Sequence, residues 1–241
     1  AWLAEEERSS APKTRPPAPE AKMFTSRALW LFFIAASFTF SLRDFAGSGM
    51  GSLTSLFLQQ AHGFNPKFTG LALSGFFLAS AISNPLFGGL SDRGRIRWIS
   101  FVLVTAAVLM NVFPRVSEAW MVPVLLVYGF FFMSSYPMVE AALMDSVPDA
   151  VRGRVFGLFI TVGGTAGNVA HWAVGNWVKQ LGANAPSPPS YYPLYAWLSV
   201  LVLLSLAGLP CLHAIRKREQ VGGASGGAAS PHSVSPSPAS P

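Results

Sequence analysis

The sequence has few charged residues and almost no cysteine. Only 12% of its 241 residues are Asp, Glu, Lys or Arg, against roughly 25% in ordinary soluble domains. A single cysteine, Cys211, excludes an intrachain disulfide, and four histidines without paired cysteines argue against a structural zinc site. A Gly-x-x-x-x-Gly-Lys phosphate loop is also missing, so the sequence has no motif for ATP hydrolysis. We therefore expect neither a metal site nor a cofactor.

Long apolar runs make up for the missing charge. Hydrophobic residues form 51% of the chain, including 19 Phe and 7 Trp. A transmembrane helix needs roughly 20 mostly apolar residues, and six segments meet that length. We therefore predict an all-α polytopic membrane protein with a six-helix bundle over residues 28–218, its spans at 28–60, 68–90, 98–114, 119–144, 155–178 and 191–215.

The segments outside the bundle have a different composition. Residues 1–27 contain three consecutive glutamates and several prolines, and residues 219–241 are mostly Gly, Ala, Ser and Pro. Such segments bury too little apolar surface to offset the entropy of ordering. We expect a disordered linker before the bundle and a disordered tail after it.

The Lys and Arg residues fall mainly at alternate ends of the predicted spans. Ten lie on one side and three on the other, and positive residues are retained in the cytoplasm. This predicts that both termini are cytoplasmic, which agrees with an even number of spans. Because the basic residues form short clusters and no single surface, we expect no nucleic-acid partner. The ten are Lys22, Arg27, Arg93, Arg95, Arg97, Arg152, Arg154, Arg216, Lys217 and Arg218; the three are Lys67, Arg115 and Lys179.

Two charged residues, Arg43 and Asp44, interrupt the first span. A charge at the bilayer centre costs at least about 2.5–3.5 kcal/mol on insertion scales, so its presence indicates a function or a partner. With Ser48 they follow a polar stripe, and three alternate glycines nearby predict an interrupted helix of the kind that forms transport sites. We predict a substrate or ion site here, with Asp44 titrating. The alternative is a purely structural pair, but helix neighbours point about 100° apart, so we do not expect these two to satisfy each other completely.

Two further spans carry candidate site residues. In the fifth, Asn168 and His171 lie on a glycine-rich polar face and could line a cavity, although His171 could equally be a hydrogen-bonded packing residue. In the fourth, Glu140 lies near the cytoplasmic end. It either takes part in coupling or, as we expect, pairs with Arg152 or Arg154.

The loop after the second span carries a recognisable motif. Its residues 88–97 read Gly-Gly-Leu-Ser-Asp-Arg-Gly-Arg-Ile-Arg. This run resembles the cytoplasmic loop signature of the major facilitator superfamily, but it lacks one residue between Arg93 and Gly94. Gly88 would permit close helix approach, and Asp92 and Arg93, with Gly94 and Arg95, would form a conformational latch. The run 148–157 is similar to that of bacterial drug-efflux and fosmidomycin-resistance members.

The resemblance implies a function and partners. It implies that the chain is the C-terminal six-helix half of a twelve-helix secondary transporter, consistent with a sequence that starts without Met. Such a protein moves a small solute by alternating access, driven by a gradient that we expect to be of protons. The implied partners are the solute, H+, the lipid bilayer and a missing N-terminal half or a second copy. We expect it in the bacterial inner membrane, and not to be an enzyme.

Three other classes stay open. A membrane scaffold or receptor would need no transport site, and a six-span channel would conduct ions far faster. An intramembrane serine protease is suggested by the string around His171, but such enzymes need a Gly-x-Ser-Gly turn on an earlier helix. Here that turn occurs only at residues 223–226 in the tail, and Ser48 lacks the pattern.

Overall fold

The structure is a computed structural model that describes residues 27–91, 94–147, 149–215 and 217. The predicted linker, except for Arg27, and the whole predicted tail lie outside these residues. Most of the described residues are helical, with short turns between the helices, and none of them lies in a strand. This confirms the predicted all-α fold of a polytopic membrane protein.

Six long helices occupy the places in the chain where the apolar runs predict them. The last one continues after a turn at Leu206 and Ala207 as a further helical segment over residues 208–215, and short 3-10 turns end or begin several others. The helices are α2 (Arg27–Leu56), which runs into a π-helical turn (Phe57–Ala61), α3 (Pro66–Ser91), α4 (Arg95–Val112), α5 (Glu118–Met144), α6 (Arg152–Leu181) and α7 (Tyr192–Ser205).

Five of the six are apolar enough to cross a membrane, and α6 is the one that falls short. Its 30 residues would reach about 45 Å at 1.5 Å per residue, so length is not the reason. The reason is composition, because Gly, Thr and Asn recur along it and His171 adds a further polar side chain. Its apolar stripe faces α2, and small or polar residues occupy much of the opposite face.

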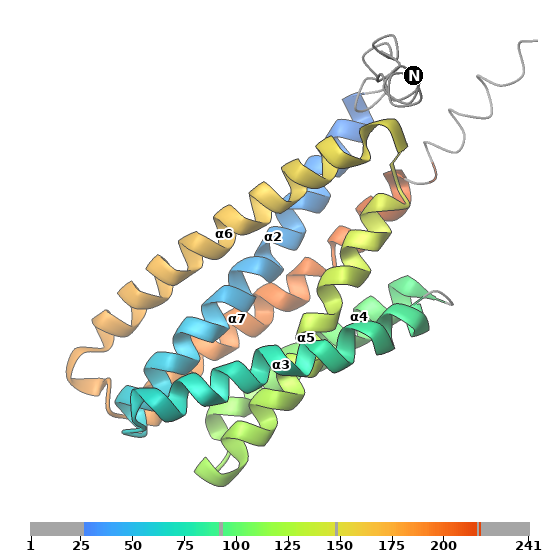
Figure 1. Ribbon diagram of the computed structural model, residues 1–241. Helices are drawn as coiled ribbons and strands as arrows, with labels where there is room; N and C mark the ends of the chain where they lie inside the picture. Colours follow the sequence, from blue (N-terminus) through green and yellow to red (C-terminus); the bar gives the residue numbers. More distant parts are fainter. Residues whose placement is uncertain (1–26, 92–93, 148, 216, 218–241) are drawn as a thin grey trace, which may run out of the picture.

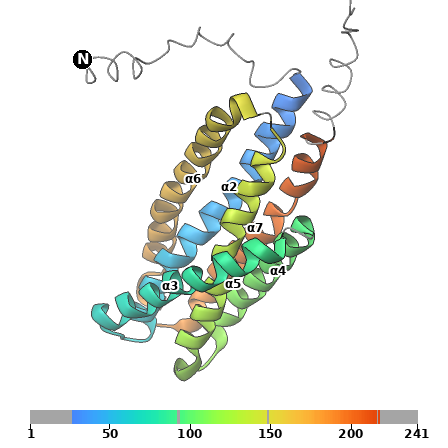
Figure 2. The ribbon, with the colours of Figure 1, turned by 45° about the vertical axis from the view of Figure 1, so that its right-hand side comes forward.

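The helices pack as two related groups of three. α2 lies between α6 and α7, while α5 lies between α3 and α4, and α4 also packs on α7 (Figures 1 and 2). If α2 is exchanged with α5, α3 with α6, and α4 with α7, each of these packed pairs again becomes one of the packed pairs. Because successive helices alternate in direction, the three helices α2–α4 run opposite to their counterparts α5–α7. This is the inverted internal repeat found in many transporter folds.

α2 is continuous where three glycines predicted an interruption, so that prediction is wrong. Gly47 and Gly49 lie inside the unbroken helix. A side chain at Gly47 would overlap the ring of Phe132, 2.5 Å away, and one at Gly49 would lie 3.1 Å from Leu198. The glycines therefore serve close packing of α2 against α5 and α7, and the helix keeps its hydrogen bonds.

Candidate functional site: a polar cavity between α2, α5 and α6

Arg43 is the most unusual buried residue of the bundle. It lies about midway along α2 and is only 1% exposed. Its Nε and Nη2 donate to Oδ1 of Asp44 at 3.0 and 2.8 Å, and its Nη1 donates to the Ser135 carbonyl of α5 at 3.3 Å. The neighbours pair because the long arginine side chain folds back onto the next carboxylate, but, as expected, they do not satisfy each other completely. The third donor still reaches another helix.

Aromatic rings complete the surroundings of the guanidinium group. Its carbon lies 4.1 Å from the ring centre of Tyr136 and 5.8 Å from that of Phe40. A cation over an aromatic face is stabilised by about 0.5–2 kcal/mol, more when water is excluded. Arg43 is thus held by a carboxylate, a carbonyl and two rings from α2 and α5.

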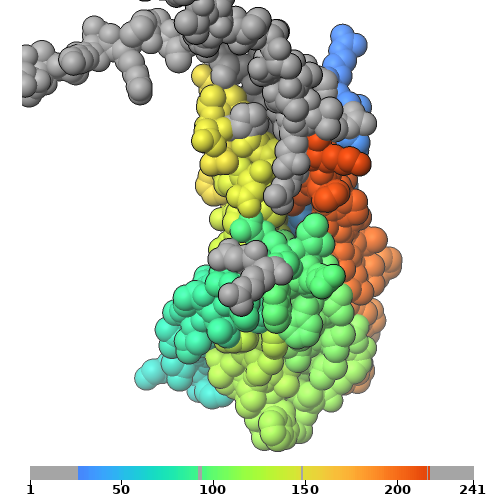
Figure 3. Space-filling view, turned by 90° about the vertical axis from the view of Figure 1, so that its right-hand side faces the viewer, coloured from blue at the N-terminus to red at the C-terminus, as the bar shows by residue number. Residues whose placement is uncertain are grey.

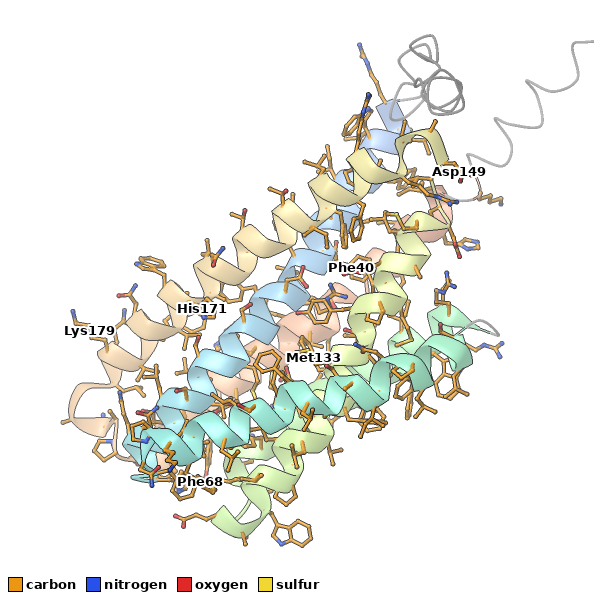
Figure 4. The ribbon with its side chains drawn as sticks, viewed as in Figure 1. Phe40, Phe68, Met133, Asp149, His171 and Lys179 are labelled. Atoms are coloured by element: carbon orange, nitrogen blue, oxygen red, sulfur yellow. The ribbon has the colours of Figure 1, made fainter. Side chains whose placement is uncertain are left out.

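α2 and α6 contact each other at regular four-residue steps. They run in the same direction, and each contacting pair is 119 residues apart in sequence. A side chain on Gly163 would overlap the Asp44 carboxylate, and one on Gly167 would lie 2.7 Å from the Ser48 hydroxyl. The ladder, whose two ends are marked by Phe40 and His171 in Figure 4, consists of Phe40–Phe159, Asp44–Gly163, Ser48–Gly167 and Ser52–His171.

Beside this ladder lies a cavity of about 400 Å³. All six residues that the sequence indicated as binding or coupling candidates line this cavity. They come from three helices that are distant in sequence. They are Arg43, Asp44 and Ser48 from α2, Glu140 from α5, and Asn168 and His171 from α6. Tyr136 and the small residues Gly163, Gly164 and Gly167 complete most of the remaining wall.

Glu140 does not meet Arg152, so that expectation is wrong. Arg152 pairs with Asp149 at 2.9 Å and its Nε donates to the Met144 carbonyl at 2.9 Å. These partners lie at the end of α5, more than one helical turn beyond Glu140. Glu140 has no ion-pair partner among the described residues, and the charged groups that act on it are Arg43 and Asp44.

Sequence reasoning did not include Ser52 or Tyr136 in the site. Ser52 lies eight residues after Asp44 on the same face of α2, and its hydroxyl is 2.5 Å from Nδ1 of His171. The four-residue spacing from Asp44 was a signal that could have found it. Tyr136 follows two serines and lies four residues before Glu140, so the one-turn spacing from Glu140 could have found it.

The latch motif is only partly described. Asp92 and Arg93 lie outside the described residues. Gly94 precedes α4 with φ of +153°, a conformation that favours glycine, and Nη1 of Arg95 pairs with the Asp145 carboxylate at the end of α5. A side chain at Gly88 would meet no atom within 4 Å. Gly88 therefore does not serve close helix approach within this six-helix unit.

The Ser52–His171 contact is of the type that serine proteases use for catalysis, but among the described residues other parts of such a site are missing from its surroundings. Ser48 contacts Gly167, and it is Ser52 that bonds His171. Ser52 lies inside the continuous helix α2, where backbone N–H groups are already bonded to carbonyls four residues earlier. They cannot supply the oxyanion hole that acyl transfer requires. The pair lacks this part of a protease site.

The comparisons with known proteins agree with the inverted-repeat bundle and its buried charges. Residues 2–171 match the family model described as Major Facilitator Superfamily. No curated protein and no solved structure matches the chain. The family match covers more than two thirds of the sequence, so the chain belongs to the major facilitator superfamily of secondary transporters.

Proposed function

We propose that the chain transports a small solute by alternating access, driven by a proton gradient, with the cavity between α2, α5 and α6 as the binding site. The observation that carries the proposal is the Arg43–Asp44 pair at mid-span, with Arg43 buried, beside Glu140, which has no ion-pair partner among the described residues. A pair alone could be structural. A second carboxylate without a cation makes the site incomplete until something binds.

The charges of the cavity support proton coupling at Glu140. Arg43 and Asp44 cancel, so Glu140 leaves one excess negative charge when His171 is neutral. An uncompensated charge in such surroundings is costly and is relieved by a proton or by a cationic group. We therefore assign the proton-carrying role to Glu140 and not to Asp44, because the Asp44 carboxylate already pairs with Arg43. A proton and a cationic solute would then compete for one carboxylate.

The outer face of α6 supports a partner bundle. Thr165 and Gly175, which do not line the cavity, are exposed there beside Trp172, which is 72% exposed. Polar groups facing lipid are costly, whereas small residues permit close helix packing. The proposal therefore includes a second six-helix half, with this chain as the C-terminal one, or failing that a second copy. We also propose that the protein belongs to the drug-efflux subfamily and lies in the bacterial inner membrane with both termini in the cytoplasm.

Transport is tested with the full chain reconstituted in lipid vesicles that contain a pH-sensitive dye. A pH gradient is imposed and small organic cations are added; we expect a solute-dependent proton flux. Glu140→Gln should abolish the proton flux and leave solute exchange, whereas Glu118→Gln, at an exposed acid outside the cavity, should preserve both. Absence of solute flux under any gradient, both for the chain alone and for the chain reconstituted together with an N-terminal half, would refute the transport function, and proton coupling in Glu140→Gln would refute the role of this carboxylate.

The partner is tested by cross-linking. In a Cys211→Ser background, Thr165→Cys should form a disulfide between copies if two chains meet along α6. Lys67→Cys, at an exposed position of α3, is the matched control. If Thr165→Cys instead forms a disulfide only with a cysteine placed on a co-expressed N-terminal half, the result would identify the twelve-helix arrangement. Cross-linking equal to that of the control in both cases would remove α6 as the interface.

A further inference from the structure

A second and larger cavity, of about 670 Å³, lies where several helices end. It shares no lining residue with the polar cavity described above. Figure 3 looks at the molecule from the side on which α3 and α4, in green, end beside the orange-red final segment. The lining residues come from the ends of α3, α4 and α5 and from the final segment: Ser91, Gly94, Arg95, Ile96, Arg97, Ala142, Asp145, Ser146, Leu209, Leu212 and His213.

The charges of this basic cavity favour an anion. Arg95 and Asp145 form an ion pair and cancel. Arg97 is exposed and has no ion-pair partner among the described residues, and the same holds for the exposed His213. The hydroxyls of Ser91 and Ser146 donate to backbone carbonyls, at 2.9 and 2.6 Å, so they offer no free proton. Among the described lining residues, the positive group left for a ligand is Arg97, with the His213 side chain in the same wall.

The start of α4 adds to this positive character. The helix begins at Arg95 and has 18 residues. Its N-terminal end carries a partial positive charge and free N–H donors, which suit phosphate oxygens. Gly94, the residue before the first turn, has no side chain that could accept hydrogen bonds from those N–H groups. The helix end and Arg97 therefore act on the same space.

The apolar part of the wall indicates an amphipathic ligand. Leu209, Leu212, Ile96 and Ala142 line the cavity together with the charged groups. Its position at the ends of apolar spans corresponds to the headgroup level of a bilayer, where Trp is enriched. Trp98, one turn into α4, packs its ring against Phe87 and Phe101, with centres 5.9 and 5.8 Å away. Ile96 is 47% exposed, so a free anion would leave it in contact with water, whereas an acyl chain would cover it.

We propose that the basic cavity binds the phosphate group of an anionic phospholipid, with Arg97 and the start of α4 as its positive partners and the exposed side chain of Ile96 against the upper acyl chain. Basic pockets between transmembrane helices on one membrane side bind such headgroups. The volume lies within the range of about 300–1,000 Å³ typical of ligand sites. A lipid here would join the α3–α4 loop to the ends of α5 and of the final segment.

The test uses the purified full chain in nanodiscs of phosphatidylcholine containing a small fraction of spin-labelled phosphatidylglycerol. We expect enrichment of the labelled lipid around the protein. Arg97→Gln should reduce its affinity about fivefold, the effect of one basic residue near an anionic surface. Lys179→Gln, which removes one charge at the far end of α6, is the control and should leave the affinity unchanged.

A second variant separates the cavity from general surface attraction. Ala142→Leu adds bulk inside the cavity without changing charge, and it should also lower the affinity for phosphatidylglycerol. Equal helical content by circular dichroism checks that each variant is folded. Loss in Arg97→Gln but not in Ala142→Leu would reduce the effect to surface electrostatics and overturn the proposal. Displacement of the lipid by millimolar inorganic phosphate would overturn it too, because it would identify a free-phosphate site.

Discussion

The Asp44 carboxylate of α2 occupies the space that a side chain would fill at Gly163 of α6. Its Oδ1 accepts two hydrogen bonds from Arg43, while Oδ2 points at the glycine. The orientation of the only buried ion pair of the cavity among the described residues thus depends on the absence of a methyl group on another helix. Packing of α2 against α6 and the charge arrangement of the cavity cannot change independently.

Gly163→Ala should therefore disturb both properties. The added methyl group overlaps the carboxylate, and such overpacking typically costs about 1–3 kcal/mol. We expect a lower denaturation midpoint in detergent, measured by circular dichroism, and reduced transport. Gly164→Ala is an unusually close control, because a methyl group there meets no atom within 4 Å. It should equal or exceed the parent in stability, and equal losses in both variants would mean that helix α6 responds to any alanine.

Removing only the positive charge of Arg43 should destabilise the protein more than removing the charges of both Arg43 and Asp44. Arg43→Gln leaves Asp44, whose side chain is 14% exposed, charged and without its partner beside Glu140. Breaking a fully buried pair typically costs about 3–5 kcal/mol, and we expect a loss toward the lower end of that range. Arg43→Gln with Asp44→Asn removes both charges, so the double variant should recover most of the stability but not transport. Both are measured by denaturation midpoint and vesicle flux. If the single variant is as stable as the double one, the carboxylate does not depend on Arg43.

Arg115→Gln is the control for that pair of variants. Arg115 also lies over an aromatic ring, 4.8 Å from the centre of Tyr192, but it is exposed. Its loss should change the free energy of unfolding by less than about 1 kcal/mol, since exposed charge interactions contribute little.

The sequence predicts the bundle well because hydropathy measures the property that the membrane selects. Each of the six apolar runs contains a helix, and the charges at Arg43 and Asp44 indicate the site because burial makes them costly. The glycines were ambiguous: Gly47 and Gly49 fit either an interrupted helix or close packing. Only the positions of Phe132 and Leu198 decide between the two.

Pairing between side chains is what the sequence could not supply. Glu140 is close in sequence to Arg152, yet α5 ends before Asp149, and the arginine pairs there. Arg95 and Asp145 are 50 residues apart and meet only because α4 starts where α5 ends. Such contacts depend on how the helices are arranged in space, and the hydrophobic periodicity of one sequence does not determine that arrangement.

The aromatic partner of Arg43 can be separated into ring and hydroxyl. Tyr136→Phe keeps the ring 4.1 Å from the guanidinium carbon, so most of the cation–π stabilisation should remain. Tyr136→Leu removes it and should lower the free energy of unfolding by about 1–2 kcal/mol more than the phenylalanine variant does. Denaturation of the two variants in parallel measures this difference. Equal losses would assign the contribution of Tyr136 to its hydroxyl.

The Ser52–His171 contact should behave as a packing hydrogen bond and not as a catalytic pair. A serine activated by histidine reacts with fluorophosphonates, whereas Ser52 in a continuous helix lacks an oxyanion hole. We expect no covalent labelling of the folded chain by a fluorophosphonate probe, measured by intact-mass spectrometry. Ser52→Ala should cost about 1 kcal/mol of stability, the usual value of one hydrogen bond. Labelling that disappears in Ser52→Ala would contradict this and reinstate hydrolysis as an activity of the chain.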